Sequence, residues 1–152
     1  MTGARRKQET DWIGVFNAGV FLILVGAMWA MNPSLAGEAI GFFKDFQLVE
    51  VSRGIMLPAP ASNHPVLYGA VANLMLAYGL FQIIILGLRI LFKDSFERKV
   101  ETASGIVFLI ALSLFLRMLA DETIGWLGFL GGLLVCIGLS IVVSSGIRLL
   151  KT

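Results

Sequence analysis

Hydrophobic residues gather in four long runs along the chain, and most charged residues lie between or beside those runs. The runs cover about residues 12–31, 65–92, 103–120 and 124–147. A hydrocarbon core about 30 Å thick needs about 20 apolar residues in a helix. All four runs meet or approach that length, so the pattern predicts four transmembrane helices. The third run is the shortest, and it contains Arg117.

The first run has a second interpretation, because basic residues precede it and "SLAG" follows it like a signal-peptide cleavage site. Its apolar region is longer than the roughly 7–15 residues of a secretory signal. We therefore interpret the run as a membrane span, with Trp12 and Trp29 as interfacial anchors.

The segment 32–64 between the first two runs has a pattern of its own. When residues 35–46 are placed at helical intervals of about 100°, one sector of about 120° collects the apolar side chains. These are Leu35, Ala36, Ala39, Phe42, Phe43 and Phe46. The pattern predicts an amphipathic helix in the membrane interface. Beyond it, Arg53-Gly54 separates two short β-prone runs and indicates a hairpin.

Lysine and arginine placement predicts the orientation. Nine basic residues fall on the side of the N-terminus: Arg5, Arg6, Lys7, Arg89, Lys93, Arg98, Lys99, Arg148 and Lys151. Three fall on the other side: Lys44, Arg53 and Arg117. Acidic residues split evenly, and basic residues favour the cytoplasmic side of membrane proteins. We expect both termini in the cytoplasm of a cell and residues 32–64 outside.

Composition agrees with a membrane protein. Of 152 residues, 57% are hydrophobic and 14% are charged, against about 25% charged in a soluble domain. One histidine and one cysteine cannot supply a zinc or bis-histidine haem site, and no nucleotide-binding or nucleophile motif occurs. We predict an all-α polytopic membrane protein, a single transmembrane domain over 1–152, with no cofactor and no nucleic-acid partner.

His64 precedes the second run in "SNHPVLY". Ser62 and Asn63 are residue types that cap helices, and Pro65 suits a first helical turn. The histidine could alternatively sense external pH or contribute one metal ligand. Because no second ligand is near in the sequence, we interpret His64 as part of a helix start.

Polar side chains inside the runs are few, and no Asp, Glu, Lys or His lies in the middle of a run. This argues against a proton relay and against the small multidrug-resistance transporters, which rely on a glutamate in the first span. The candidates are Asn17, Asn73, Gln82 and Arg117. Asn17 and Gln82 share a depth with Ser140, and Asn73 shares one with Ser113. We expect hydrogen bonds between helices, and the alternative is a polar path.

Arg117 lies about one turn from the outer end of its run. Asp121 follows at helical spacing, so we predict an ion pair between the two. The alternative is contact with an anion or a lipid headgroup.

Small residues recur every fourth position in the last run: Gly128, Gly132, Cys136, Ser140 and Ser144. We call this set the small-residue strip. Small side chains let helices approach closely, so the strip predicts a packing surface, within the chain or between chains.

The stretches "FFKDFQLVEV", "GIMLPAPASNHPVLYGA", "GLFQIIILGLR" and "ETIGWLGFLGGLLVCIGLSIVVSS" resemble a family of small archaeal multi-pass membrane proteins. The resemblance covers most of the chain from the first run onward. It implies the four-span architecture and an archaeal membrane location. Because that family is uncharacterised, it implies no activity and no site residues.

The leading functional hypothesis is a non-enzymatic accessory or scaffolding subunit that packs through small-residue helix faces, with other subunits or copies of itself as partners in the lipid bilayer. The second is a small oligomeric transporter or channel lined by Asn17, Asn73 and Gln82. The third is an enzyme acting at the outer surface through Arg117, Asp121, Glu122 and His64.

Overall fold

The computed structural model describes residues 12–150 and contains five helices and one hairpin. The elements are α1 (Trp12–Met31), α2 (Leu35–Lys44), β1 (Phe46–Ser52), β2 (Ile55–Pro60), α3 (Pro65–Leu91), α4 (Phe96–Ala120) and α5 (Trp126–Leu149). Four of these helices, α1, α3, α4 and α5, are long and apolar enough to cross a membrane by length and composition. This confirms the four helices predicted from the hydrophobic runs.

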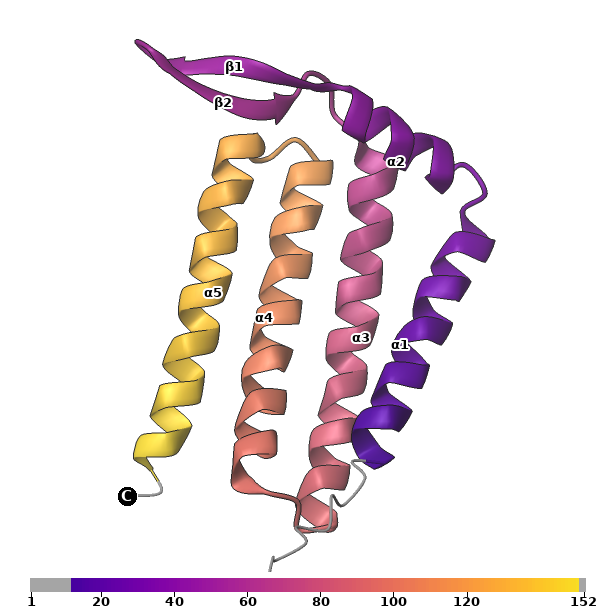
Figure 1. Cartoon of the computed structure of the whole chain (residues 1–152), viewed down its shortest axis with the longest axis vertical. Coiled ribbons are helices and arrows are strands. Elements are labelled where there is room, and N and C mark those ends of the chain that lie inside the picture. Colours follow the sequence, from indigo (N-terminus) through magenta and orange to yellow (C-terminus); the bar gives the residue numbers. More distant parts are fainter. Residues whose placement is uncertain (1–11, 151–152) are drawn as a thin grey trace, which may run out of the picture.

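The long helices stand side by side in the order α1, α3, α4, α5 (Figure 1). Packing is most extensive between α3 and α4, followed by α4 with α5 and α1 with α3. The α2 helix and the hairpin lie across one end of the long helices, which we call the hairpin end (Figure 1). The start of α1, the α3–α4 turn and the end of α5 lie at the opposite end, which we call the terminal end.

The α4 helix begins at Phe96, seven residues before the predicted run. Hydropathy could not reveal these two turns because they carry Glu97, Arg98, Lys99 and Glu101. Their inward face is nonetheless apolar, since Val100 is 1% exposed. The Ser95 hydroxyl accepts a hydrogen bond from Arg98 N–H at 3.4 Å and caps the helix. The helix therefore continues past the apolar run at the terminal end.

Two tight turns join α3 to α4 and α4 to α5 in the same way. Lys93 and Glu122 follow the helix ends with φ values of 53° and 57°. Asp94 N–H donates to the Arg89 carbonyl at 2.9 Å, and Thr123 N–H donates to the Met118 carbonyl at 2.9 Å. Both turns are Schellman motifs with a side chain where glycine is preferred.

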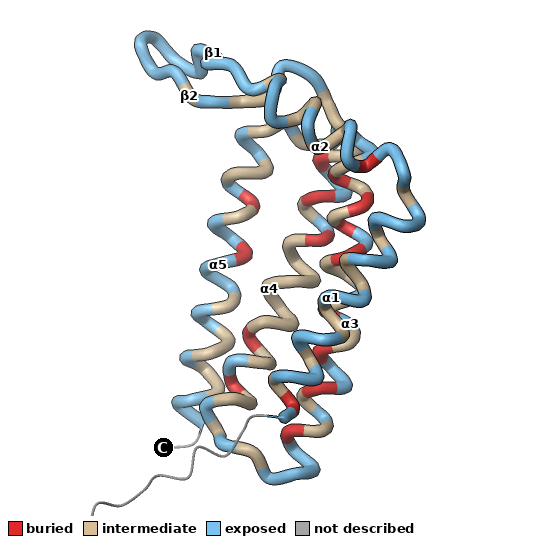
Figure 2. The backbone as a smooth tube through the Cα atoms, turned by 45° about the vertical axis from the view of Figure 1, so that its right-hand side comes forward, coloured by how far each residue is buried: buried red, intermediate tan, exposed pale blue. Residues whose placement is uncertain are grey.

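Buried residues are most frequent in α3 and α4 (Figure 2). Ala72 and Ile85 of α3 are 0% exposed. Gly79 permits close approach here, because a Cβ atom at this position would lie 3.2 Å from Leu109 Cβ. In α1 only Ile13 is buried. The flanking helices α1 and α5 thus expose apolar surface, as lipid-facing helices do.

The hairpin is antiparallel, as predicted, with Gly54 at φ 81° in its turn. The preceding helix, however, ends at Lys44, and Phe46 lies in β1. Asp45 ends α2, because its backbone N–H bonds the carbonyls of Gly41 and Phe42. Every residue of β1 is exposed.

Candidate functional site

The small-residue strip on α5 packs within the chain at its centre. Gly132 and Cys136 are the buried residues of α5. A Cβ atom at Gly132 would lie 2.6 Å from Phe115 Cε1, so the ring of this α4 residue occupies the space above the glycine. Gly128 is exposed, and Ser140 and Ser144 are half-buried. Residues four apart drift by about 40° around a helix, which turns the ends of the strip away from α4.

Arg117 binds Asn73 and does not pair with Asp121. Its Nη2 donates to Asn73 Oδ1 of α3 at 2.6 Å. No ion pair joins Arg117 and Asp121 among residues 12–150, so that prediction was wrong. Helical side chains point back toward the N-terminus of their helix. The guanidinium therefore extends away from Asp121, which ends α4, and reaches the level of Asn73.

The other intramembrane polar groups stay apart. Ser113 is 1% exposed, and its hydroxyl donates to the Ile110 carbonyl at 2.8 Å in its own helix. Gln82 is buried in α3, and Asn17 Oδ1 is buried with no hydrogen-bond partner in the described part of the chain. No hydrogen bond links Asn17, Gln82 and Ser140 within residues 12–150. Only Asn73 forms the kind of interhelical bond that was expected.

At the hairpin end, a polar cluster gathers around the Asp45 carboxylate. Oδ2 of Asp45 accepts hydrogen bonds from the Ser62 N–H at 2.7 Å and from the Ser62 hydroxyl at 2.6 Å. His64 Nε2 lies 3.2 Å from the same oxygen, and His64 Nδ1 lies 3.7 Å from Glu38 Oε2. The Ser62 hydroxyl, the Ser62 N–H and His64 lower the pKa of Asp45. The cluster joins the segment before α3 to the polar face of α2.

His64 immediately precedes α3 as its N-cap residue, but its side chain makes no capping bond. Neither Ser62 nor Asn63 caps the helix as their residue types suggested. Asn63 Nδ2 instead donates to the Ala120 carbonyl at 3.3 Å and to Glu122 Oε1 at 3.0 Å. The imidazole is largely buried between two carboxylates, so His64 does more than begin a helix. Within the described residues, no group of three or more His, Cys, Asp or Glu side chains could hold a metal ion.

Aromatic rings pack beneath α2 around Phe42. Its ring contacts those of Phe46, His64, Tyr68 and Trp126, at centroid distances between 5.0 and 6.0 Å. Such edge-to-face pairs favour a fixed arrangement. The Trp126 indole N–H also donates to the Pro58 carbonyl of β2 at 3.1 Å. These contacts fasten α2 and the base of the hairpin to α3 and α5.

Two depressions accompany this end of the molecule. One, of about 260 Å³, lies beneath the hairpin base and is lined by Ser62, Asn63, Glu122 and Trp126 among others. A larger one, of about 410 Å³, lies between α1 and α3 and includes Asn32 and Asn73. Ser62 of the first depression donates its hydroxyl to the Asp45 carboxylate. Amides and apolar side chains line both depressions, with charged groups nearby, and such groups are suited to binding a ligand.

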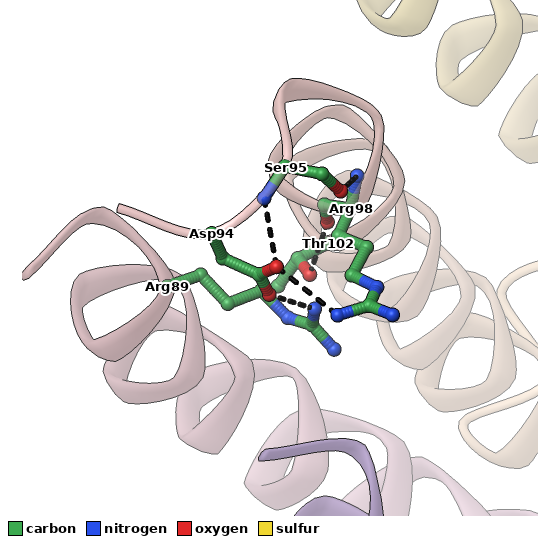
Figure 3. Close-up of polar contacts among 5 residues, drawn as sticks. All are labelled: Arg89, Asp94, Ser95, Arg98 and Thr102. Carbon is green, nitrogen blue, oxygen red and sulfur yellow. Dashed lines mark hydrogen bonds and ion pairs between the residues drawn. The ribbon is translucent and has the colours of Figure 1, made fainter. Parts of the chain in front are cut away.

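A second polar cluster closes the terminal end (Figure 3). Arg89 Nη1 of α3 donates to Asp94 Oδ2 at 2.6 Å, and Arg98 Nη1 of α4 lies 3.1 Å from Asp94 Oδ1. Burial disfavours the charged carboxylate, but the Ser95 N–H and the two arginines outweigh that effect and lower the pKa of Asp94. Asp94 thus links α3 to α4 at their turn, and its role is structural.

Only part of the polar cluster at the hairpin end could be predicted from the sequence. Glu38 and Asp45 are seven residues apart and therefore share a helix face, so their proximity was foreseeable. Nothing in the sequence indicated that Ser62 and His64 return to that face. No family model, no curated protein and no solved structure matches the chain.

Proposed function

We propose that this chain is a non-enzymatic membrane subunit, an accessory or scaffolding protein that binds a partner protein through its hairpin. The observation that carries the proposal is the uncovered apolar surface of β1 and β2. An isolated two-stranded hairpin is marginally stable in water. This one nevertheless carries apolar side chains on both faces.

At its base, one face of the hairpin contacts the helices. Phe46 contacts the Trp126 ring at 5.6 Å, and Leu48 shares its face, because side chains alternate along a strand. The register pairs Val49 with Leu57, which places these two on the opposite face together with Ile55. Val49 is 38% exposed and Ile55 56%. A partner on this second face would remove these side chains from water.

The edges of the hairpin favour one mode of binding. Pro58 and Pro60 lie in β2, and proline cannot donate to a neighbouring strand. β1 contains no proline, so its free edge has backbone groups available for pairing. An extended segment of a partner can add to such an edge. β1 is therefore the contact strand in this proposal.

The orientation forms part of the proposal. The terminal end carries most of the basic residues, so it faces the cytoplasm by the positive-inside rule. The hairpin end then faces outside, with α2 in the interface and Phe43, which is 75% exposed, directed to lipid. A cysteine at Ser52 should react with an impermeant reagent on intact cells, and one at Ser95 should not. Reversed labelling would contradict the orientation.

The small-residue strip supports packing within the chain at Gly132, so it is not the partner surface in this proposal. A small transporter or channel remains the alternative function. It is less well supported, because Asn73 lies on an exposed face of α3 and is bound to Arg117.

A photo-crosslinking side chain tests the partner surface. Placed at Val49 in native membranes, it should form a crosslink to a protein. Placed at Leu48, on the opposite face of the same strand and 68% exposed, it should not. Val49→Asp should abolish association measured by co-purification without lowering the unfolding temperature.

The mass of the crosslinked species identifies the partner class. A product at twice the mass of the chain would mean that the partner is a second copy. If neither position reaches protein while the chain remains folded, the hairpin is not a docking surface and the proposal fails.

A further inference from the structure

The depression between α1 and α3 is a groove that opens toward the hairpin end. Ring contacts hold the helices together nearer the terminal end, where Trp12 meets Phe92 at 5.2 Å and Phe16 meets Phe81 at 6.1 Å. Beyond these contacts α1 leans away from α3 (Figure 1). The groove, of about 410 Å³, lies in this wider part, and Gly69 and Ala77 of α3 form part of its wall. We call it the α1–α3 groove.

The surroundings and length of the groove suit a lipid chain. Both walls belong to helices apolar enough to cross a membrane, so lipid is the medium at its mouth. On α3 it extends from Pro65 to Ala77, which is about 18 Å of helix at 1.5 Å per residue. Asn73 divides it into an outer part, from Pro65 to Ala70, and a shorter inner part that ends at Ala77. The volume also falls in the range of about 300–1,000 Å³ seen for ligand pockets.

The cationic side chain of Arg117 lies beside the groove. Asn73 lines it, and Arg117 of α4 donates to that amide at 2.6 Å. The pairing leaves the charge of Arg117 uncompensated within residues 12–150, because Asn73 is neutral and no acidic side chain there forms an ion pair with Arg117. An arginine near the end of a span is costly without an anion or access to the interface.

The depth of Arg117 is compatible with a lipid headgroup. The α3 helix has 27 residues and is about 40 Å long, so it exceeds the hydrocarbon core and its first turns lie in the headgroup region. Asn73 lies about 12 Å along the helix from Pro65.

We propose that the α1–α3 groove binds an anionic lipid, whose phosphate is held by the Arg117 guanidinium and the Asn73 amide N–H. The headgroup occupies the outer part of the groove, and one acyl chain leaves past Ala77. Guanidinium and phosphate form charge-assisted hydrogen bonds that a neutral side chain cannot replace. The site selects the lipid by charge, and the groove receives the headgroup and the first part of one acyl chain. This site is independent of the partner proposed for the hairpin.

Native mass spectrometry of the full chain can test this site. The protein in mild detergent is mixed with phosphatidylglycerol, with phosphatidylcholine of the same acyl chains, or with inorganic phosphate. The intact protein should retain phosphatidylglycerol in preference to phosphatidylcholine. Arg117→Gln should lower that affinity about tenfold, while Arg53→Gln at the hairpin turn should leave it unchanged.

Two glycines of α3 supply a matched pair that tests occupancy of the groove. A Cβ atom at Gly69 or at Gly87 meets nothing within 4 Å, so leucine fits at both positions. Only Gly69 lines the groove. Gly69→Leu should therefore lower retention of phosphatidylglycerol, whereas Gly87→Leu should not. Circular dichroism and thermal unfolding establish that both variants are folded.

Three outcomes would overturn the assignment. Equal retention of both lipids by the native chain and Arg117→Gln would remove the role of charge. Retention of inorganic phosphate without any lipid preference would mean an anion site alone. Loss of binding in Arg117→Gln but not in Gly69→Leu would place the lipid outside the groove.

Discussion

An alanine at Gly132 would bring a methyl group against the ring of Phe115. The new Cβ would lie 2.6 Å from Cε1 and 2.7 Å from Cγ, closer than carbon atoms pack. The ring must therefore move as a rigid body, or α5 must withdraw from α4. Overpacking of this kind costs about 1–3 kcal/mol.

The matched control is Gly138→Ala on the same helix. Gly138 is exposed, and a Cβ atom there meets nothing within 4 Å. Both substitutions gain about 1 kcal/mol of helix propensity, so their difference isolates the clash. Gly132→Ala should be less stable than Gly138→Ala by about 1–3 kcal/mol.

The assay is reversible unfolding in mixed micelles of increasing denaturing-detergent content, followed by circular dichroism. A Phe115→Leu background completes a double-mutant cycle, because coupled neighbours deviate from additivity. In that background the two glycine variants should approach equal stability. If they are already equal beside Phe115, or if Phe115→Leu leaves the difference unchanged, α5 does not pack on α4 through Gly132.

Three further predictions concern the turns and the polar clusters. Lys93→Gly should raise the free energy of unfolding by about 0.5–1 kcal/mol, because Lys93 has a positive φ that favours glycine; no gain in a denaturant titration would contradict this. Asp94→Asn should cost about 3 kcal/mol in the same titration, because it removes the carboxylate charge that the buried Arg89 contacts at 2.6 Å; retained stability would mean that the cluster is dispensable. The lowered pKa of Asp45 means that its stabilising effect is present above pH 3.8, the ordinary value, and is lost as the pH falls through the lower folded value. Ser62→Ala should reduce that acid-dependent loss in thermal unfolding between pH 5 and 2, and an unchanged profile would argue against the contact.

Local patterns predicted the long helices and the hairpin, because both depend on residues close in the sequence. Periodicity also predicted the α2 helix, but it placed the end at residue 46, whereas α2 ends at Lys44. The pattern extended the apolar sector to Phe46, whereas the backbone turns at Asp45 into β1. Hydropathy did not predict the first turns of α4, because these turns contain four charged residues and only one buried apolar residue, Val100.

Contacts between distant residues were not predictable in the same way. The strip on α5 indicated a packing face but not Phe115 as its neighbour, since nothing in α4 identifies which face meets α5. Arg117 had an acidic residue at helical spacing and a neutral amide 44 residues away. Because helical side chains point toward the N-terminus of their helix, the Arg117 side chain reaches the amide of Asn73 and not Asp121. The hairpin-end cluster likewise depends on the return of residues 61–64 to α2, which no local signal encodes.

The unequal connections between the long helices have a consequence for biosynthesis. Short turns join α3, α4 and α5, whereas α1 is followed by α2 and the hairpin before its main packing partner α3 begins. The chain must grow from Met31 to Leu91 before α3 is complete, which takes about 3–12 s at roughly 5–20 residues per second. During this interval α1 resides in the bilayer as a solitary span, so its surface must suit lipid on all sides. The amide of Asn17 then lies in hydrocarbon during synthesis, and its Oδ1 gains no hydrogen-bond partner among residues 12–150 when the rest of the chain folds.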